Sequence, residues 1–195
     1  RAISLMFFLS GAAALIYQIV WTSKLALVFG VTLYATSAVI CTFMAGLALG
    51  SLYFGRLVDR WDRPLVLFAI LEAGLGVFAF VFPALADLLR RTYVLFYGPF
   101  GDNHYVMSLV RFAMAFLVLI VPTSLMGGTL PVITRACVLR SKHLGRRVAG
   151  LYSANNIGAF VGCLAAGYVL LELWGPTGSL RFAAALNLAV AAMSL

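Results

Sequence analysis

The ten residues 55–64, GRLVDRWDRP, concentrate charge in a chain that otherwise carries little of it. Five of the ten are charged, whereas charged residues make up 10% of the 195 residues. Long apolar runs lie on both sides, so the stretch is interpreted as a polar connection between two membrane spans. Gly55 permits a tight exit from the preceding helix, and Pro64 suits the first turn of the next one.

The composition of the whole chain is that of a membrane protein. Hydrophobic residues make up 64% of it, and the mean hydropathy is +1.05, whereas soluble domains are about 45–50% apolar and about 25% charged. A spanning helix needs roughly 20 apolar residues, and in lipid it must satisfy its own backbone polar groups. The sequence predicts an all-α membrane protein, a single domain over 1–195 with six transmembrane helices. The expected segments are 3–29, 33–54, 64–88, 105–126, 148–171 and 179–195.

The distribution of Lys and Arg predicts the orientation of these segments. Nine of the fourteen Lys and Arg residues fall on one side of the predicted membrane. They are Arg1, three arginines of 55–64 and five basic residues of 135–147. Basic residues collect in cytoplasmic loops, so both termini are expected to be cytoplasmic in a multi-pass protein of the plasma (inner) membrane. The same placement explains the net charge of +8 without nucleic acid, which is not expected as a partner.

Six side chains within the apolar runs are candidates for lining a polar cavity. Glu72 lies about eight residues into the third segment, too deep for easy solvation, so it should face a partner, a cavity or bind a proton. Amides in lipid also need partners, and interhelical hydrogen bonds among them are the structural alternative to a ligand cavity. The candidate cavity residues are Tyr17, Gln18, Trp21, Glu72, Asn155 and Asn156.

Helix contacts and irregularities are also expected from small residues and prolines. Gly46 and Gly50 form one GxxxG pair and Gly158 and Gly162 another, a spacing that allows close helix approach. Prolines and glycines in 122–131 predict a kink or break in the fourth segment, followed by an interfacial helix. Residues 89–104 are expected to form the longest outer connection.

No catalytic signature, metal site or cofactor motif is present in the sequence. There is no Gly-rich loop after a strand and no Ser/His/Asp set. The three cysteines are scattered, without a CxxC pair or a Cys/His cluster. The sequence therefore predicts no catalytic residues, no metal and no cofactor within 1–195, and the Leu195 terminus inside an apolar run predicts that the natural chain continues.

The charged connection resembles the loop between the second and third helices of the major facilitator superfamily. The matching residues are Gly55, Leu57, Asp59, Arg60 and Arg63, whereas Asp62 stands where that family has a second glycine. The resemblance implies half of a major-facilitator-type bundle, with Gly55, Asp59, Arg60 and Arg63 as its cytoplasmic loop motif. Such a half needs a homodimer partner, a second membrane half or another membrane subunit.

A second resemblance covers almost the whole chain. The stretches 10–30, 43–60, 122–136 and 145–171 are similar to the membrane region of spermidine-synthase-like membrane proteins. That resemblance implies a membrane domain that anchors a fused cytoplasmic aminopropyltransferase-like domain and handles polyamine or a related small molecule. Two alternatives stay open: half of a major-facilitator-type transporter, and a structural membrane subunit of a larger complex. Whether the whole protein is an enzyme is not decided by these residues.

Overall fold

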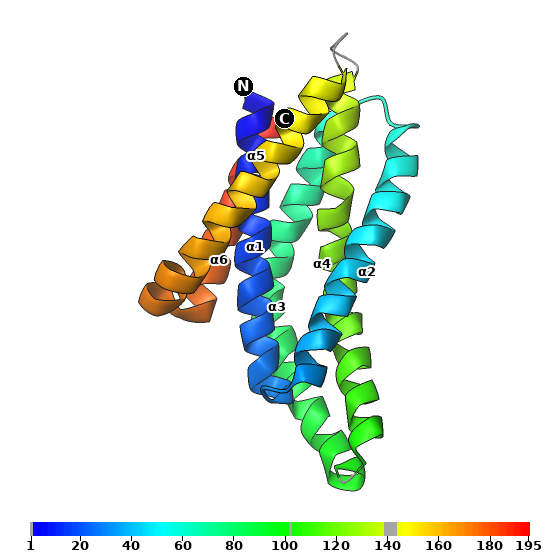
Figure 1. The fold of residues 1–195 in the computed structure, drawn as a ribbon, viewed down its shortest axis with the longest axis vertical. Coiled ribbons are helices and arrows are strands. Elements are labelled where there is room, and N and C mark those ends of the chain that lie inside the picture. Colours follow the sequence, from blue (N-terminus) through cyan, green and yellow to red (C-terminus); the bar gives the residue numbers. More distant parts are fainter. Residues whose placement is uncertain (1, 102, 139–143) are drawn as a thin grey trace.

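The computed structural model describes residues 2–101, 103–138 and 144–195, and these residues form helices joined by short connections (Figure 1). The elements are α1 (Ala2–Phe29), α2 (Leu33–Val58), α3 (Pro64–Phe100), α4 (His104–Val138), α5 (Leu144–Ala165), a π-helical turn η1 (Ala166–Leu170) and α6 (Leu171–Ser194). By length and composition, five helices could each cross a bilayer. The predicted all-helical, multi-pass membrane protein is confirmed at this level.

The predicted fifth and sixth segments lie within one helical stretch, Gly145–Ser194. That stretch is interrupted at Gly175, whose φ of 64° and ψ of −178° are not helical. Glycine tolerates a positive φ, and Pro176 directly after it suits the first turn of a new helix. The chain reverses there, so that 176–194 runs back behind 144–174 (Figure 1).

The described residues at both ends of the chain lie at one end of the bundle, together with the connection 59–63 (Figure 1). The connection 30–32 and the tip between α3 and α4 lie at the opposite end. This arrangement agrees with the alternation predicted from the sequence. Three of the basic residues used to predict the orientation lie outside the described residues: Arg1, Arg140 and Lys142. Positions 102 and 143 also lie outside them.

Two tightly packed helix pairs form the bundle, and glycines lie at both contacts. In the first pair, a Cβ at Gly46 or Gly50 of α2 would overlap Thr123 or the Ser124 backbone of α4. On the other side of this contact, a Cβ at Gly127 would overlap the Leu47 backbone. The close helix approach predicted for this GxxxG pair is confirmed, with α4 as the partner.

The second pair is α1 with α5. A Cβ at Gly158 would overlap the Phe8 carbonyl of α1, and one at Gly162 would overlap the Ala12 carbonyl. Both GxxxG faces are therefore occupied within the chain. Neither face is free to pack against a helix of another subunit. The reason is that each face is covered by a helix distant in sequence, which helix spacing alone does not reveal.

α3 and α6 lie behind the two pairs and provide much of the apolar core (Figure 1). Trp21 of α1 packs on Phe78 and Phe82 of α3, with ring centroids 5.7 and 5.5 Å apart. Leu180 and Ala183 of α6 are buried in the same cluster.

Two predictions about α3 and α4 need correction. Residues 89–104 do not form a long outer loop, because α3 continues to Phe100 and α4 begins at His104. At about 1.5 Å per residue, the 37-residue α3 is some 55 Å long, well beyond the roughly 30 Å hydrocarbon core. The extension is held by Arg111, whose Nε donates to the Tyr93 hydroxyl at 3.0 Å.

The predicted break near Pro122 and Pro131 is also absent, since both prolines lie inside the continuous helix α4. Thr123 and Thr129 donate to backbone carbonyls of the preceding turn, the first to Leu119 at 2.5 Å and the second to Met126 at 2.7 Å. A packed neighbouring helix is one means by which proline is tolerated in membrane helices. The close contact with α2 supplies that neighbour.

Candidate functional site

A carboxyl group is buried at the centre of the bundle. Glu72 of α3 has no exposed surface, and its Oε1 accepts a hydrogen bond of 2.5 Å from the Ser10 hydroxyl of α1. Its other oxygen, Oε2, has no hydrogen-bond partner within the part of the chain that the structure describes. An acidic group in an apolar interior without a partner is costly, which makes this carboxyl a candidate for a function other than packing.

A small cavity lies beside the Ser10 hydroxyl. Its volume is about 130 Å³, and every helix of the bundle contributes to its wall. The lining residues are Ser10, Ala14 and Leu15 of α1, Phe43 and Leu47 of α2, Leu75 of α3, Met126 and Thr129 of α4, Asn155 of α5 and Asn187 of α6. Glu72 therefore lies one hydrogen bond behind the cavity wall.

Asn187 is the second residue near the cavity that has a polar atom without a hydrogen-bond partner among the described residues. Asn187 lines the cavity and is 1% exposed, and its enclosed Oδ1 accepts no hydrogen bond from any described residue. Asn155 is satisfied, since its Nδ2 donates to the Phe7 carbonyl at 3.1 Å. That bond uses the close approach of α5 to α1 at Gly158.

The aromatic candidates lie in the core and not on the cavity wall. Tyr17 and Trp21 stack on each other with centroids 5.0 Å apart and an interplanar angle of 13°. Both are buried, and neither the Tyr17 hydroxyl nor the Trp21 Nε1 has a hydrogen-bond partner. Tyr17 lies near enough to Glu72 to interact with it electrostatically.

The structure brings together only part of the predicted set. Asn155 lines the cavity and Glu72 reaches it through Ser10. Gln18 is half-buried and does not line the cavity, and Asn156 is exposed. Residues 155 and 156 are consecutive on a helix, so they point about 100° apart and cannot share one face. The prediction that Asn156 points into the bundle is wrong.

Three polar residues that line the cavity were not predicted from the sequence: Ser10, Thr129 and Asn187. A signal existed for Asn187, because an amide stands in the apolar run 179–195 just as Asn155 stands in 148–171. Ser10 and Thr129 gave no such signal. A hydroxyl in an apolar helix usually bonds its own backbone, as Thr129 does.

The charged connection is exposed at one end of the bundle. Asp59 lies at the C-terminal cap of α2 and Arg63 at the N-terminal cap of α3, and both side chains are exposed, as is Arg60. Among the described residues, Asp59 makes no ion pair. Gly55 does not mark the exit from the helix, because α2 continues to Val58. Pro64 does lie in the first turn of α3, as predicted.

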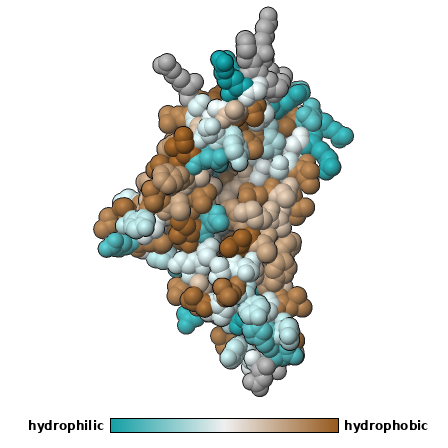
Figure 2. All heavy atoms as spheres, viewed as in Figure 1, coloured by the Kyte–Doolittle hydropathy of each residue, from teal (hydrophilic) through white to brown (hydrophobic). Residues whose placement is uncertain are grey.

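A cleft lies between the two helix pairs on one face of the bundle. The face shown in Figure 2 is hollowed between α1 and α5 on one side and α2 and α4 on the other. A polar patch lies inside the hollow, surrounded by apolar surface (Figure 2). Within the described ranges, no three His, Cys, Asp or Glu side chains come together as a metal site would require.

The fold and the site define a helical membrane protein with a small polar cavity at its centre. The two groups without partners at the cavity, the Asn187 Oδ1 and the Glu72 Oε2 behind it, are oxygen atoms that accept hydrogen bonds. A matching ligand would supply donors or positive charge. Comparison of the chain with known protein families, curated proteins and solved structures found no match.

Proposed function

We propose that this chain is a membrane domain that binds the protonated amine end of a small molecule, of the polyamine class, in its central cavity. The observation that carries the proposal is a pair of buried oxygens without a partner among the described residues, the Asn187 Oδ1 and the Glu72 Oε2, next to a small cavity that Asn187 and Ser10 line. An ammonium group has three donors and no acceptor. Its charge and its donors both complement this lining.

The size of the cavity limits what enters it. Pockets for whole small molecules usually measure about 300–1,000 Å³, and this cavity is about 130 Å³. It has room for an ammonium group with a few waters. The rest of a polyamine chain would lie along the cleft between the two helix pairs, next to the half-buried Asn155 of the cavity wall.

The resemblance to spermidine-synthase-like membrane proteins supports the choice of amine. Under this proposal the chain anchors an aminopropyltransferase-like domain and takes up or releases its amine. The open cleft favours the second candidate function, half of a facilitator-type transporter, because a second bundle placed on that face would close it. The partner under this proposal is a second membrane half, a second copy of the chain or another membrane subunit.

The proposed topology has six spans with both ends cytoplasmic. It takes the reversal at Gly175 as the boundary between the last two spans. In a chain whose cysteines are replaced by serine, a cysteine at Val31 should react with an impermeant maleimide added outside intact cells. A cysteine at Trp61 should react only after the membrane is opened. Both native side chains are exposed, so a cysteine at either position can react, and the opposite pattern would reverse the proposed orientation.

Asn187→Leu separates ligand binding from stability. An unsatisfied buried polar group costs about 1–3 kcal/mol, so the leucine variant should unfold at a higher temperature than the wild type without ligand. The stabilisation that spermidine gives to the wild type should be lost in the variant. It is measured as the shift of the unfolding midpoint at millimolar spermidine, in the purified full chain in mild detergent.

The control for this measurement is Asn156→Leu, which replaces an exposed amide on the neighbouring helix and should keep the spermidine effect. An uncharged polyol of similar length should shift neither protein. A wild-type chain that spermidine does not stabilise would contradict the amine proposal.

A further inference from the structure

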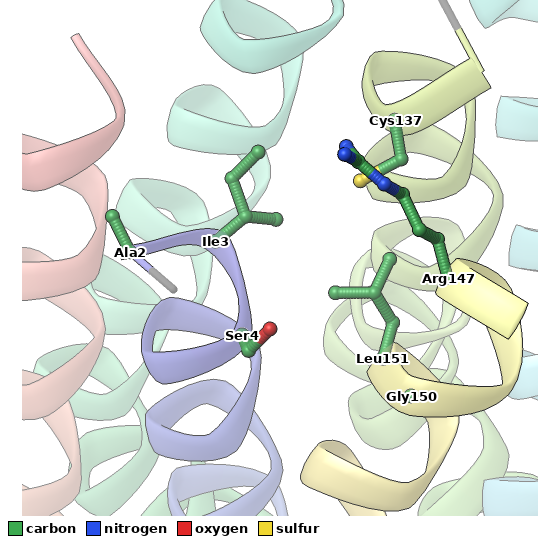
Figure 3. A pocket seen from close by; sticks show the side chains of 7 residues that line it. All are labelled: Ala2, Ile3, Ser4, Cys137, Arg147, Gly150 and Leu151. Carbon is green, nitrogen blue, oxygen red and sulfur yellow. The ribbon is translucent and has the colours of Figure 1, made fainter. Parts of the chain in front are cut away.

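A second and larger pocket lies at the end of the bundle that holds the 59–63 connection. It measures about 540 Å³ and is formed by the first turns of α1, the end of α4 and the first turns of α5. Its lining residues are Ala2, Ile3, Ser4, Cys137, Arg147, Gly150 and Leu151. Figure 3 shows Ile3 and Ser4 on one side of the space and Leu151 and Arg147 on the other. Its volume lies within the usual range for ligand sites.

The charge of this pocket is of one sign. Arg147 extends from α5 across the pocket towards Cys137 of α4 (Figure 3). The three helices that form the wall, over 2–29, 104–138 and 144–165, contain no Asp or Glu in their sequences. Asp62, an acid at the same end, lines a different pocket with Pro64 and Ser194. Arg147 therefore faces the pocket without a neighbouring carboxylate from these helices.

The remaining wall combines a hydroxyl with apolar surface. Ser4 offers a hydroxyl on the wall opposite Arg147 (Figure 3), and Arg is well suited to bidentate contact with a phosphate. Ile3 and Leu151 offer apolar contact beside these polar groups. A basic pocket between membrane helices at the cytoplasmic surface is the kind of site that binds acidic lipid headgroups.

We propose that this pocket binds the headgroup of an anionic phospholipid, with Arg147 on the phosphate, Ser4 facing the rest of the headgroup, and Ile3 and Leu151 beside the acyl chains. The site is separate from the central cavity and does not depend on the amine proposal. Inorganic phosphate shares the phosphate chemistry but gains nothing from the apolar wall, so the lipid is the occupant assigned here.

Arg147→Ala tests the charge. We expect phosphatidylglycerol to bind the full-length chain about fivefold more weakly in this variant, since a basic residue at the membrane surface contributes about that factor. Binding is measured by native mass spectrometry of the purified chain in mild detergent, with phosphatidylcholine as the comparison lipid. Arg146→Ala is the matched control, because it removes the same charge one position away and does not line the pocket.

Gly150→Leu tests the space with every charge kept. A Cβ at Gly150 meets nothing within 4 Å, so leucine should be accommodated by the fold and should fill the pocket. We expect a loss of phosphatidylglycerol binding similar to that in Arg147→Ala. Gly145→Leu is the control, since a Cβ there also meets nothing within 4 Å and Gly145 does not line the pocket.

Three outcomes would overturn the proposal. Equal loss in Arg146→Ala and Arg147→Ala would show a general surface charge effect and no defined site. Unchanged lipid binding in Gly150→Leu, with the same unfolding midpoint as wild type, would show that the pocket is not used. Binding of inorganic phosphate alone, with no preference for phosphatidylglycerol over phosphatidylcholine, would overturn the lipid assignment.

Discussion

Replacing Gly158 by alanine is expected to destabilise the chain by about 1–3 kcal/mol, the usual cost of overpacking a close contact. The new methyl group would overlap the Phe8 carbonyl of α1. Backbone cannot move aside as the end of a side chain can, so α1 and α5 would have to separate. Gly50→Ala should act in the same way on the other pair, where the methyl group would overlap the Ser124 carbonyl of α4.

The matched control for both variants is Gly150→Ala, in the same helix as Gly158. A Cβ at Gly150 meets nothing within 4 Å, and alanine favours a helix over glycine by about 0.8–1.0 kcal/mol. This variant should therefore be as stable as wild type or more so. The measurement is helical ellipticity against temperature in mild detergent. If all three variants unfold at the same midpoint, the glycine contacts between the helix pairs are not as close as described.

Substitutions of Glu72 are expected to have the largest effect on ligand binding. Glu72→Gln can keep the hydrogen bond from Ser10, so its stability should stay within about 1 kcal/mol of wild type. Glutamine cannot ionise, whereas a carboxylate behind the cavity would act strongly on a bound cation in a medium of low dielectric constant. Spermidine should therefore bind at least about tenfold more weakly, which corresponds to about 1.4 kcal/mol.

Glu72→Ala provides the structural comparison. It leaves the Ser10 hydroxyl without its partner and opens space in the core, which together should cost about 2–5 kcal/mol. Thermal unfolding measures stability, and the concentration of spermidine that gives half of its stabilising effect measures binding. A Gln variant that binds spermidine as wild type does would leave Glu72 as a structural hydrogen-bond acceptor and would remove it from the proposed site.

Several features of the fold could be predicted from the sequence because they depend on local composition. Apolar runs of about 20 residues must be helical in lipid, and the predicted segments are helical, the last two of them within the single stretch Gly145–Ser194. Pro64 in the first turn of α3 follows from the chemistry of proline. The glycine spacing in α2 and α5 indicated close contacts, which the structure contains.

The extents of α3 and α4 depended on contacts that the sequence does not display. Residues 89–100 read as an outer loop because they hold glycine, proline and aromatic residues. In the structure they continue α3, where Tyr93 accepts from Arg111 and packs on Phe29 with centroids 5.4 Å apart. Likewise, Pro122 and Pro131 predicted a break that packing of α4 on α2 removes.

Glu72 and Asn155 could be selected from the sequence alone, because an acid or an amide in an apolar run stands out and must find a partner. The tertiary structure alone decided which groups meet them. It placed Ser10 against Glu72 across 62 positions of sequence, brought Asn187 to the same cavity as Asn155, and left Asn156 exposed. The physical reason is rotation: neighbouring residues on a helix point about 100° apart. Only the packing of α1 on α5 and of α3 on α6 sets which of these directions faces the interior.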